Sequence, residues 1–536
     1  MGSLNPGNSG FSRVLAGDYV DKTGLLSLIN QSIESSKYLT CISRPRRFGK
    51  TYAAQMLCAY YDKSCDSSSL FSSLSIAKDP SYKRHLNSYD VIYIDMTGIK
   101  PYTDQYSNIT SYLINTISEE VKAAYPSVII KDNLSLTLEN VVAHTGNKFV
   151  IIIDEWDAPI RENPAVHKKY LEFLRSLFKN SLSTSKIFAA AYMTGILPIK
   201  KDGNESAISD FDEYTMVNPR KYSEYVGFTE AEVLALCKKN NIDFSLMKKW
   251  YDGYSFFCYG NSIDTDDSGF LSIYNPNSVM KAVYNKSFES YWSLSSSADN
   301  LLNYISRDYS GLSKTIAELI GGIEVKVDTL DFQNDLTSFS GKDDVLTLLI
   351  HLGYLSYNSQ TGTVHIPNEE IKLEFQRTIR KTTHEETLLR LCQSDQLFMD
   401  TIEQNADAVA LQIERIHREE CSPLHYNKED SLRSVIKLAY YTYKDNYLQF
   451  EELPSALGYA DIVYLPKKNS DCPALVIELK WNKTAKTAID QIKAKHYPDA
   501  LKGYGGKILL VGISYDKDND SDKKHHCVIE CVGDSE

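Results

Sequence analysis

The chain has 536 residues, of which 43% are hydrophobic and 24% are charged. One hydrophobic core cannot cover that length, so we expect about two to four globular domains. The formal net charge of −12 excludes a general nucleic-acid coating protein, which would carry a basic face, although a local basic patch can still bind nucleic acid.

A phosphate-binding loop is predicted near the N-terminus. Residues 38–43 are an apolar run typical of a short strand, residues 44–51 read Arg-Pro-Arg-Arg-Phe-Gly-Lys-Thr, and residues 52–61 are typical of a helix. Strand, loop and helix is the context that such a loop requires, because a helix N-terminus offers backbone N–H groups to phosphate. Lys50 would reach the β- and γ-phosphates, and Thr51 would hold magnesium.

A second apolar strand carries the matching acids. Residues 148–153 lead directly into Asp154 and Glu155. Asp154 would bind the magnesium ion, and Glu155 would polarise the attacking water. The alternative is a buried strand that ends in two surface acids. The order of the two motifs, about 100 residues apart with βα material between them, favours nucleotide binding.

Further strands predict the sheet to which these motifs belong. Residues 91–95 and 187–193 also read as strands that alternate with helices. This alternation predicts a parallel α/β sheet with ligands at the carboxyl ends of the strands. Thr194 follows the last of these strands, where a polar sensor of the γ-phosphate is expected. A plain strand cap explains Thr194 equally well.

Several short motifs over residues 10–300 resemble the AAA-ATPase-like domain family. They are Asp21-Lys-Thr, the loop from Arg44 to Thr51, Asp154-Glu155, Thr194-Gly-Ile-Leu, Gly227-Phe-Thr-Glu, Trp250-Tyr-Asp-Gly-Tyr254 and Tyr274-Asn-Pro-Asn-Ser278. An arginine in place of the first glycine of the loop is typical of that family. The resemblance implies ATP and Mg2+ as cofactors, with nucleotide-site residues Arg47, Gly49, Lys50, Thr51, Asp154 and Thr194. Arg44 and Arg46 are candidates for phosphate contact by proximity alone, and no arginine finger is assigned.

The middle of the chain is predicted to be mainly helical. The family resemblance implies a lid-like helical extension over residues 225–320. Residues 345–352 read as a helix, residues 354–366 as a hairpin, and residues 369–375 as a helix with Asn368 as its N-cap. Helix, hairpin and helix is a winged-helix-like order. The acids of the last helix favour a rigid connector over a DNA contact.

A hairpin near the C-terminus carries the second set of candidate residues. Two apolar strands, residues 458–465 and 474–480, flank a turn rich in Lys, Asn, Ser and Asp. If the hairpin folds symmetrically, Asp461 faces Glu478 with Cβ atoms roughly 5 Å apart. Glu478 and Lys480 are two residues apart, so they share one face of their strand.

The chemistry of this face has two interpretations. Two carboxylates at that spacing hold a hard divalent cation, and a lysine beside them orients water or offsets charge on a phosphate. That constellation suits metal-dependent phosphodiester hydrolysis. The alternative is a structural salt bridge, since buried charges usually pair. Geometry alone weighs the two about evenly.

The Asp461…Glu478-x-Lys480 pattern resembles the PD-(D/E)XK nuclease superfamily. A predicted helix over residues 488–497 follows it and carries Gln491. The pattern is most similar to the branch that forms the C-terminal domain of AAA-ATPase-like proteins. The resemblance implies that Asp461 and Glu478 bind magnesium, that Lys480 is catalytic, and that Gln491 matches the glutamine of the following helix. The tyrosine of this helix lies six residues after Gln491 rather than four.

Two further features of this region are left open. Superfamily members often add an upstream acid, for which Glu451 and Glu452 are equal candidates after a predicted helix over residues 432–443. Five lysines gather around the hairpin and its helix, either as a basic patch for nucleic acid or as a solvated helix face. They are Lys480, Lys483, Lys486, Lys493 and Lys495.

The ten cysteines include no CxxC pair, which argues against a zinc ribbon or a disulfide framework and favours a reducing compartment. His525, His526, Cys527 and Cys531 lie close together, but residues 528–532 read as a last strand, which is favoured over a metal site. No run of 18 apolar residues and no apolar leader is present, so we expect a cytoplasmic protein that does not enter a membrane.

The sequence therefore predicts an α/β multidomain protein. We expect a P-loop AAA-ATPase-like domain with a parallel α/β sheet over residues 1–225 and a helical extension over 226–335. A winged-helix-like segment over 336–390 and a restriction-endonuclease-like α/β domain over 391–536 would follow. The predicted function is ATP binding and hydrolysis coupled to Mg2+-dependent cleavage of nucleic acid, with DNA favoured and homo-oligomers compatible. The alternative is an ATP-controlled switch or interaction protein whose nuclease-like domain binds nucleic acid without cleaving it.

Overall fold

The structure is a computed structural model, and its chain divides into two compact units. Unit 1 comprises Met1–Ala298 and Glu324–Glu374, and unit 2 comprises Asp299–Ile323 and Phe375–Glu536. The described residues are 4–179, 181–199, 201–202, 205–206, 208, 210–257, 269–292, 312–320, 322–330, 332, 339, 341–379, 394, 396–420, 436, 440, 447–455, 458–467, 472–495, 507–516 and 523–532.

Unit 1 is built around a five-stranded parallel sheet in the order β2-β3-β4-β1-β7. Its strands are β1 (Leu39–Ser43), β2 (Asp90–Asp95), β3 (Phe149–Asp154), β4 (Phe188–Gly195) and β7 (Asp212–Tyr214). Strands β1, β3 and β4 are buried along their whole length, as expected of parallel strands covered on both faces. Their carboxyl ends lie at one edge of the sheet, where Ser43 pairs with Gly195 and Asp95 pairs with Asp154.

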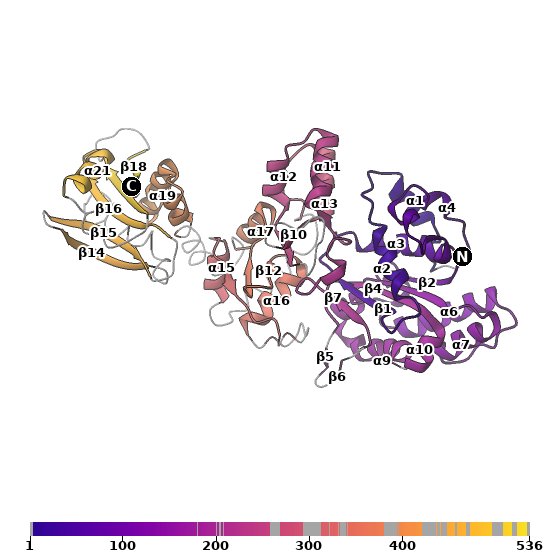
Figure 1. Ribbon diagram of the computed structural model, residues 1–536. Coiled ribbons are helices and arrows are strands. Elements are labelled where there is room, and N and C mark those ends of the chain that lie inside the picture. Colours follow the sequence, from indigo (N-terminus) through magenta and orange to yellow (C-terminus); the bar gives the residue numbers. More distant parts are fainter. Residues whose placement is uncertain are drawn as a thin grey trace. The chain divides into compact units, whose positions relative to one another are not determined.

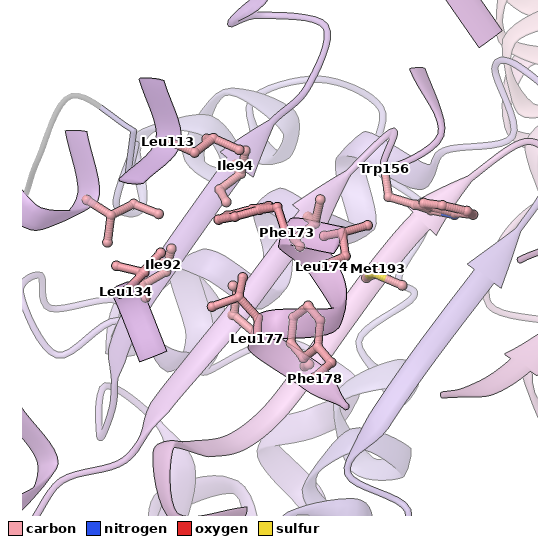
Figure 2. Close-up of a cluster of buried hydrophobic side chains, with 14 of the residues drawn as sticks. Ile92, Ile94, Leu113, Leu134, Trp156, Phe173, Leu174, Leu177, Phe178 and Met193 are labelled. Carbon is pink, nitrogen blue, oxygen red and sulfur yellow. The ribbon is translucent and has the colours of Figure 1, made fainter. Parts of the chain in front are cut away.

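Helices cover both faces of this sheet (Figure 1). Helix α3 (Lys50–Tyr61) packs on one face. Helices α6 (Ile109–Ala124), α7 (Leu134–Thr145) and α9 (His167–Phe178) close the other. The side chains between the sheet and α6, α7 and α9 form the large apolar core of unit 1 (Figure 2). This core includes Ile92, Ile94, Leu113, Leu134, Trp156, Phe173, Leu174, Leu177, Phe178 and Met193. Shorter elements of this region include α1 (Ser9–Leu15), α2 (Gly24–Ser32), α8 (Ala158–Glu162) and α10 (Ser181–Ile187).

The rest of unit 1 is a helical region followed by a helix-hairpin-helix segment. The helical region contains β8 (Phe228–Thr229), α11 (Glu230–Asn240), α12 (Phe244–Tyr251), β9 (Tyr254–Phe257), β10 (Phe270–Tyr274) and α13 (Pro276–Asn285). Thr229 and Glu232 form a capping box that starts α11. The later segment contains β11 (Val325–Lys326), α16 (Lys342–Leu352), β12 (Ser356–Asn358), β13 (Thr363–His365) and α17 (Glu369–Ile379).

The Tyr-Asp-Gly-Tyr motif joins these two regions. Gly253 has a φ of 110°, and a Cβ atom there would lie 1.9 Å from the carbonyl oxygen of Pro367, so only glycine fits. Asn368 donates from Nδ2 to the Asp252 carbonyl oxygen at 2.7 Å. The Tyr254 hydroxyl donates to the Gly353 carbonyl oxygen at 2.6 Å. The motif therefore acts as a packed turn.

Unit 2 contains a five-stranded mixed sheet in the order β14-β15-β16-β17-β18. The strands are β14 (Tyr447–Ser455), β15 (Gly458–Pro466), β16 (Ala474–Trp481), β17 (Ile508–Tyr515) and β18 (His525–Val532). Only β16 and β17 pair in parallel among these described strands. Helix α19 (Ala406–Glu420) packs against β18, α21 (Ala485–Ala494) packs over β16 and β17, and α15 (Leu312–Ile320) also belongs to this unit.

The elements expected around both motifs lie within a few residues of their predicted positions, and the α/β fold class is confirmed. The predicted helix over residues 432–443 falls largely outside the described residues. Tyr497 also lies outside them. Among the described helices, none has the length and apolarity needed to cross a membrane.

Candidate functional site

The phosphate-binding loop lies between β1 and α3. Gly49 has a φ of 91°, and no heavy atom lies within 4 Å of the position that a Cβ would take. Arg47 is also left-handed, with a φ of 70°. These two conformations turn the chain from the strand into the helix, so that α3 begins at Lys50.

Lys50 is folded back into this loop. Its Nζ donates to the carbonyl oxygens of Arg44 at 3.1 Å and Pro45 at 2.9 Å. It also forms an ion pair with Glu155 Oε1 at 3.1 Å. The side chain is only 3% exposed. The ammonium group therefore lies within the loop, and a lysine at this position binds phosphate in loops of this kind.

Asp154, Thr51 and Thr194 meet at the same edge of the sheet. Thr194 donates from Oγ1 to Asp154 Oδ1, and Thr51 also hydrogen-bonds to this carboxylate. Burial raises the pKa of Asp154 to about 6, although both hydrogen bonds act in the opposite direction. A buried carboxylate beside a threonine hydroxyl fits a hard cation with oxygen ligands, so Thr51 and Asp154 would hold the Mg2+ of a bound nucleotide.

Glu155 lies between two cations. Beside Lys50, it forms an ion pair through Oε2 with Arg161 Nη2 at 2.9 Å. Burial alone would raise the pKa of Glu155, but Lys50 and Arg161 outweigh it and the net shift is downward. Sequence reasoning missed Arg161. The contact between Arg161 and Glu155 could not be inferred from their spacing in the sequence, because it depends on the short helix α8 that residues 158–162 form.

The three arginines of the loop have different positions. Arg44 is fully buried, donates from Nη1 to the carbonyl oxygens of Ser43 and Tyr214, and lies over the ring of Phe256. Burial lowers its pKa to about 9. Arg47 donates from Nη1 to the Tyr291 carbonyl oxygen at 3.1 Å. Arg46 is close enough to Glu155 to lower its pKa.

The C-terminal hairpin has the predicted register. Ile462 pairs with Ile477 and Val463 with Val476, so the next opposite positions are Asp461 and Glu478. Asp461 Oδ2 accepts a hydrogen bond from the Leu479 backbone N at 2.8 Å.

Glu478 is the centre of this second cluster. Its Oε1 accepts from Lys480 Nζ at 2.9 Å and from Gln491 Nε2 of α21. Its Oε2 is buried without a hydrogen-bond partner in the part of the chain that the structure describes. Burial raises the pKa of Glu478, and the charge of Asp461 adds to this effect. An additional cation would satisfy the buried oxygen and offset both charges, so Asp461 and Glu478 fit a divalent metal ion.

The ligand set in the described residues stops at these two acids. No group of three His, Cys, Asp or Glu side chains that could hold a metal occurs within the described ranges. Glu451 and Glu452 lie on β14, but their side chains are outside the described residues, so the choice between them stays open.

Two residues of β17 that sequence reasoning missed complete the surroundings of this cluster. Gly512 pairs with Glu478, and a Cβ atom on it would lie 2.4 Å from the Ala485 carbonyl oxygen, so glycine lets α21 approach the sheet. Ser514 pairs with Lys480 and is fully buried, and its Oγ lacks a hydrogen-bond partner among the described residues. Only the long-range register of β16 and β17 reveals either residue.

The five lysines of the expected basic patch have different surroundings. Lys486 and Lys493 on α21 both form ion pairs with Glu530 of β18. Lys495 lies near enough to Glu478 to lower its pKa, and Lys480 bonds to it directly. Lys483 is exposed.

The C-terminal His/Cys group lies on strand β18, as predicted, and its His525 is hydrogen-bonded on both ring nitrogens. His525 Nδ1 bonds to Glu414 Oε2 at 2.6 Å, and His525 Nε2 bonds to His417 Nδ1 at 2.8 Å. This buried cluster attaches α19 to the start of β18. Burial lowers the pKa of His525.

Comparisons with known proteins match both regions of the chain. The family described as Predicted AAA-ATPase matches residues 8–204, and the PD-(D/E)XK nuclease superfamily matches residues 427–525. An uncharacterized protein in the vnfD 5' region of Azotobacter chroococcum mcd 1 is 26% identical over 294 residues. That alignment covers 53% of this chain and 52% of the relative, so the match spans about half the length of the relative.

A solved structure, the Aeropyrum Pernix ORC2 protein in ADPNP–ADP complexes, is similar over 68% of this chain and 98% of that one. Its sequence identity is 10% and its TM-score is 0.26. The family matches contain the loop and acids of the first cluster and the Asp, Glu and Lys of the second. The chain therefore combines an AAA-ATPase-like domain with a C-terminal domain of the PD-(D/E)XK nuclease superfamily.

Proposed function

We propose that this protein binds and hydrolyses ATP in its N-terminal domain and uses the nucleotide to control divalent-cation-dependent cleavage of DNA by its C-terminal domain. The observation that supports cleavage most directly is the environment of Glu478. Lys480 and Gln491 both donate to its Oε1, while Oε2 is buried and has no hydrogen-bond partner among the residues that the structure describes. If Glu478 formed only a structural salt bridge, its second carboxylate oxygen would be expected to have a hydrogen-bond partner as well.

At the C-terminal site, Asp461 and Glu478 would hold the cation. When bound, a divalent cation stabilises charge on the phosphate and makes water more acidic. Gln491 fixes the orientation of the Glu478 carboxylate, and the Leu479 backbone N fixes that of Asp461. Lys480 would then orient the attacking water or offset the charge that develops on the phosphate.

At the N-terminal site, the backbone of the loop and Lys50 would bind the phosphates. Thr51 and Asp154 would hold the cation, and Thr194 would sense the γ-phosphate from the end of β4. Glu155 would accept a proton as the water oxygen bonds to the γ-phosphorus and the bond to the bridging oxygen of ADP breaks.

The test is cleavage of plasmid and linear DNA with Mg2+, with and without ATP. Lys480→Ala should lose at least about a hundredfold in cleavage rate, because the charge that assists the phosphate is gone. Lys507→Ala is the matched control, since Lys507 is exposed at the opposite end of the sheet strands from Lys480. It should cleave at the wild-type rate.

Three results would reject or correct the proposal. Equal cleavage by wild type and Lys480→Ala would show that another residue or a contaminant performs the reaction. Absence of DNA cleavage by wild type under every nucleotide condition would favour the ATP-controlled binding protein, and cleavage of RNA alone would replace DNA as the substrate.

A further inference from the structure

Arg161 joins two acids that follow β3. Its Nη2 lies 2.9 Å from Glu155 Oε2, and its Nε lies 2.9 Å from Asp157 Oδ2. The arginine is 10% exposed and Asp157 is 1% exposed. A planar guanidinium that binds two carboxylates at once holds both in fixed directions, which a lysine ammonium does less well.

Asp157 connects this arginine to the next strand. Its Oδ2 accepts hydrogen bonds from the backbone N–H groups of Ile196 at 3.2 Å and Leu197 at 2.9 Å. These residues directly follow Thr194 and Gly195 at the end of β4. The position of Arg161 is therefore determined by the sheet edge that carries the nucleotide-binding residues.

The backbone of Glu155 is held in the same place. Glu155 has a φ of 53°, its N–H donates to Thr194 Oγ1 at 3.2 Å, and the next N–H, of Trp156, donates to the Thr194 carbonyl oxygen at 2.8 Å. A left-handed conformation is costly for a residue other than glycine and recurs where a functional side chain must be directed. With its backbone fixed, the carboxylate of Glu155 still needs a side-chain partner to set its direction.

Glu155 has two side-chain partners. It shares its two oxygens between Lys50 and Arg161. Lys50 is the residue that would move onto the phosphates, and it would then release Oε1. Arg161 is also bound to Asp157, so it would keep Oε2.

We propose that Arg161 is the positioning residue for Glu155: it holds the carboxylate directed at the attacking water after Lys50 has moved to the nucleotide. This inference rests on the proposed ATP hydrolysis and names the residue on which its general base depends.

The separation of turnover from nucleotide affinity provides a specific test. Arg161 is bound to Glu155 and Asp157, whereas the phosphates would be bound by the loop and Lys50. Loss of Arg161 should therefore lower kcat much more than it weakens nucleotide binding.

The experiment compares Arg161→Gln and Arg161→Lys with wild type and with Arg84→Gln. Arg84 is 72% exposed and pairs with Glu34 at 3.6 Å, so its loss controls for a general change in charge. Arg161→Gln should lower kcat at least about tenfold while nucleotide affinity stays within about threefold. Arg161→Lys should restore part of kcat, because an ammonium supplies the charge but cannot bind both acids at the wild-type geometry.

Unchanged kcat in Arg161→Gln, or an equal loss of kcat in Arg161→Gln and Arg161→Lys, would overturn the inference and leave Arg161 a structural residue. An inactive wild type would reject the ATPase itself. Binding of ADP with aluminium fluoride, which mimics the transferring phosphoryl group, would then decide the question. Wild type should bind this complex more tightly than Arg161→Gln, and equal affinities would overturn the inference.

Discussion

At the end of β3, Glu155 lies between two cations, whereas on β16, Glu478 has a neighbouring carboxylate as well as lysines. The pKa of Glu155 is lowered because Lys50 and Arg161 outweigh its burial. The pKa of Glu478 is raised because burial and Asp461 outweigh Lys480 and Lys495. The cations beside the first acid thus stabilise its charged form, whereas the surroundings of the second destabilise it.

This difference matches the chemistry proposed for the two sites. A general base at the γ-phosphate must be ionised before the reaction begins. A metal ligand can stay partly protonated until the ion arrives, because binding releases the proton. The same residue type therefore serves two roles, and its neighbours decide which.

The largest expected effect is the loss of activity at one site while the other site keeps its activity. Glu478→Gln should lower DNA cleavage at least about a hundredfold, because it removes a ligand charge, while ATP affinity and turnover stay unchanged. Lys50→Ala should do the reverse to the N-terminal site, weakening ATP binding because the phosphates lose their cation. Parallel assays of ATPase and nuclease activity on both variants measure this.

DNA cleavage by Lys50→Ala also tests whether ATP controls the nuclease. If ATP controls the nuclease, the ATP response of cleavage should disappear although the site around Glu478 is intact. A Lys50→Ala protein that still responds to ATP would contradict the proposed coupling. Loss of ATP turnover in Glu478→Gln would contradict the independence of the two active sites.

The sequence predicted what depends on local patterns. The strand ends at Asp154 and Thr194 followed from apolar runs, and the facing positions of Asp461 and Glu478 followed from the symmetry of one hairpin. Both inferences need only contacts between neighbouring elements, for which strand period and turn position suffice.

What the sequence could not predict depends on distant contacts. Ser514 reaches Lys480 only through the parallel pairing of β16 with β17. Arg44 looks like a phosphate ligand by its place in the loop, yet its side chain contacts Tyr214 and Phe256, each more than a hundred residues away. The period of a helix or strand gives no information on such pairs, because the two residues belong to different elements and the pattern does not fix the number of residues between them.

A second prediction concerns the pH dependence of cation binding. A carboxylate must lose its proton before it binds a metal, so a raised pKa makes affinity increase with pH up to that pKa. With the pKa of Asp154 at about 6, Mg2+–ATP affinity should rise up to about tenfold between about pH 5 and about pH 6 and then level off. Glu478 should make Mg2+ binding at the C-terminal site rise with pH in the same direction.

Calorimetry in two buffers of different ionisation enthalpy measures this proton release directly. Asp154→Asn is the matched variant, because it removes the titrating group and should bind Mg2+–ATP weakly with little dependence on pH. Affinities that are constant from about pH 5 to about pH 7 in the wild type would contradict the assignment of these acids as cation ligands.

The smallest expected effect comes from a charge cluster that lies outside both sites. Lys486 and Lys493 flank Glu530, but they are 56% and 50% exposed, in contrast to the 3% of Lys50. Water and salt screen such pairs, so Glu530→Gln should cost less than about 1 kcal/mol of unfolding free energy. The cost should shrink further in high salt.

The pH dependence of this small contribution has a defined sign. Hydrogen bonds from Lys486 and Lys493 lower the pKa of Glu530. A lowered carboxyl pKa stabilises the folded state above the unfolded pKa, and this contribution disappears as pH falls through the folded one. The difference in unfolding free energy between wild type and Glu530→Gln should therefore persist at neutral pH and vanish in acid, as urea titrations would show. A loss of several kcal/mol would instead mean that the surface pair is as decisive as the buried one at Glu155.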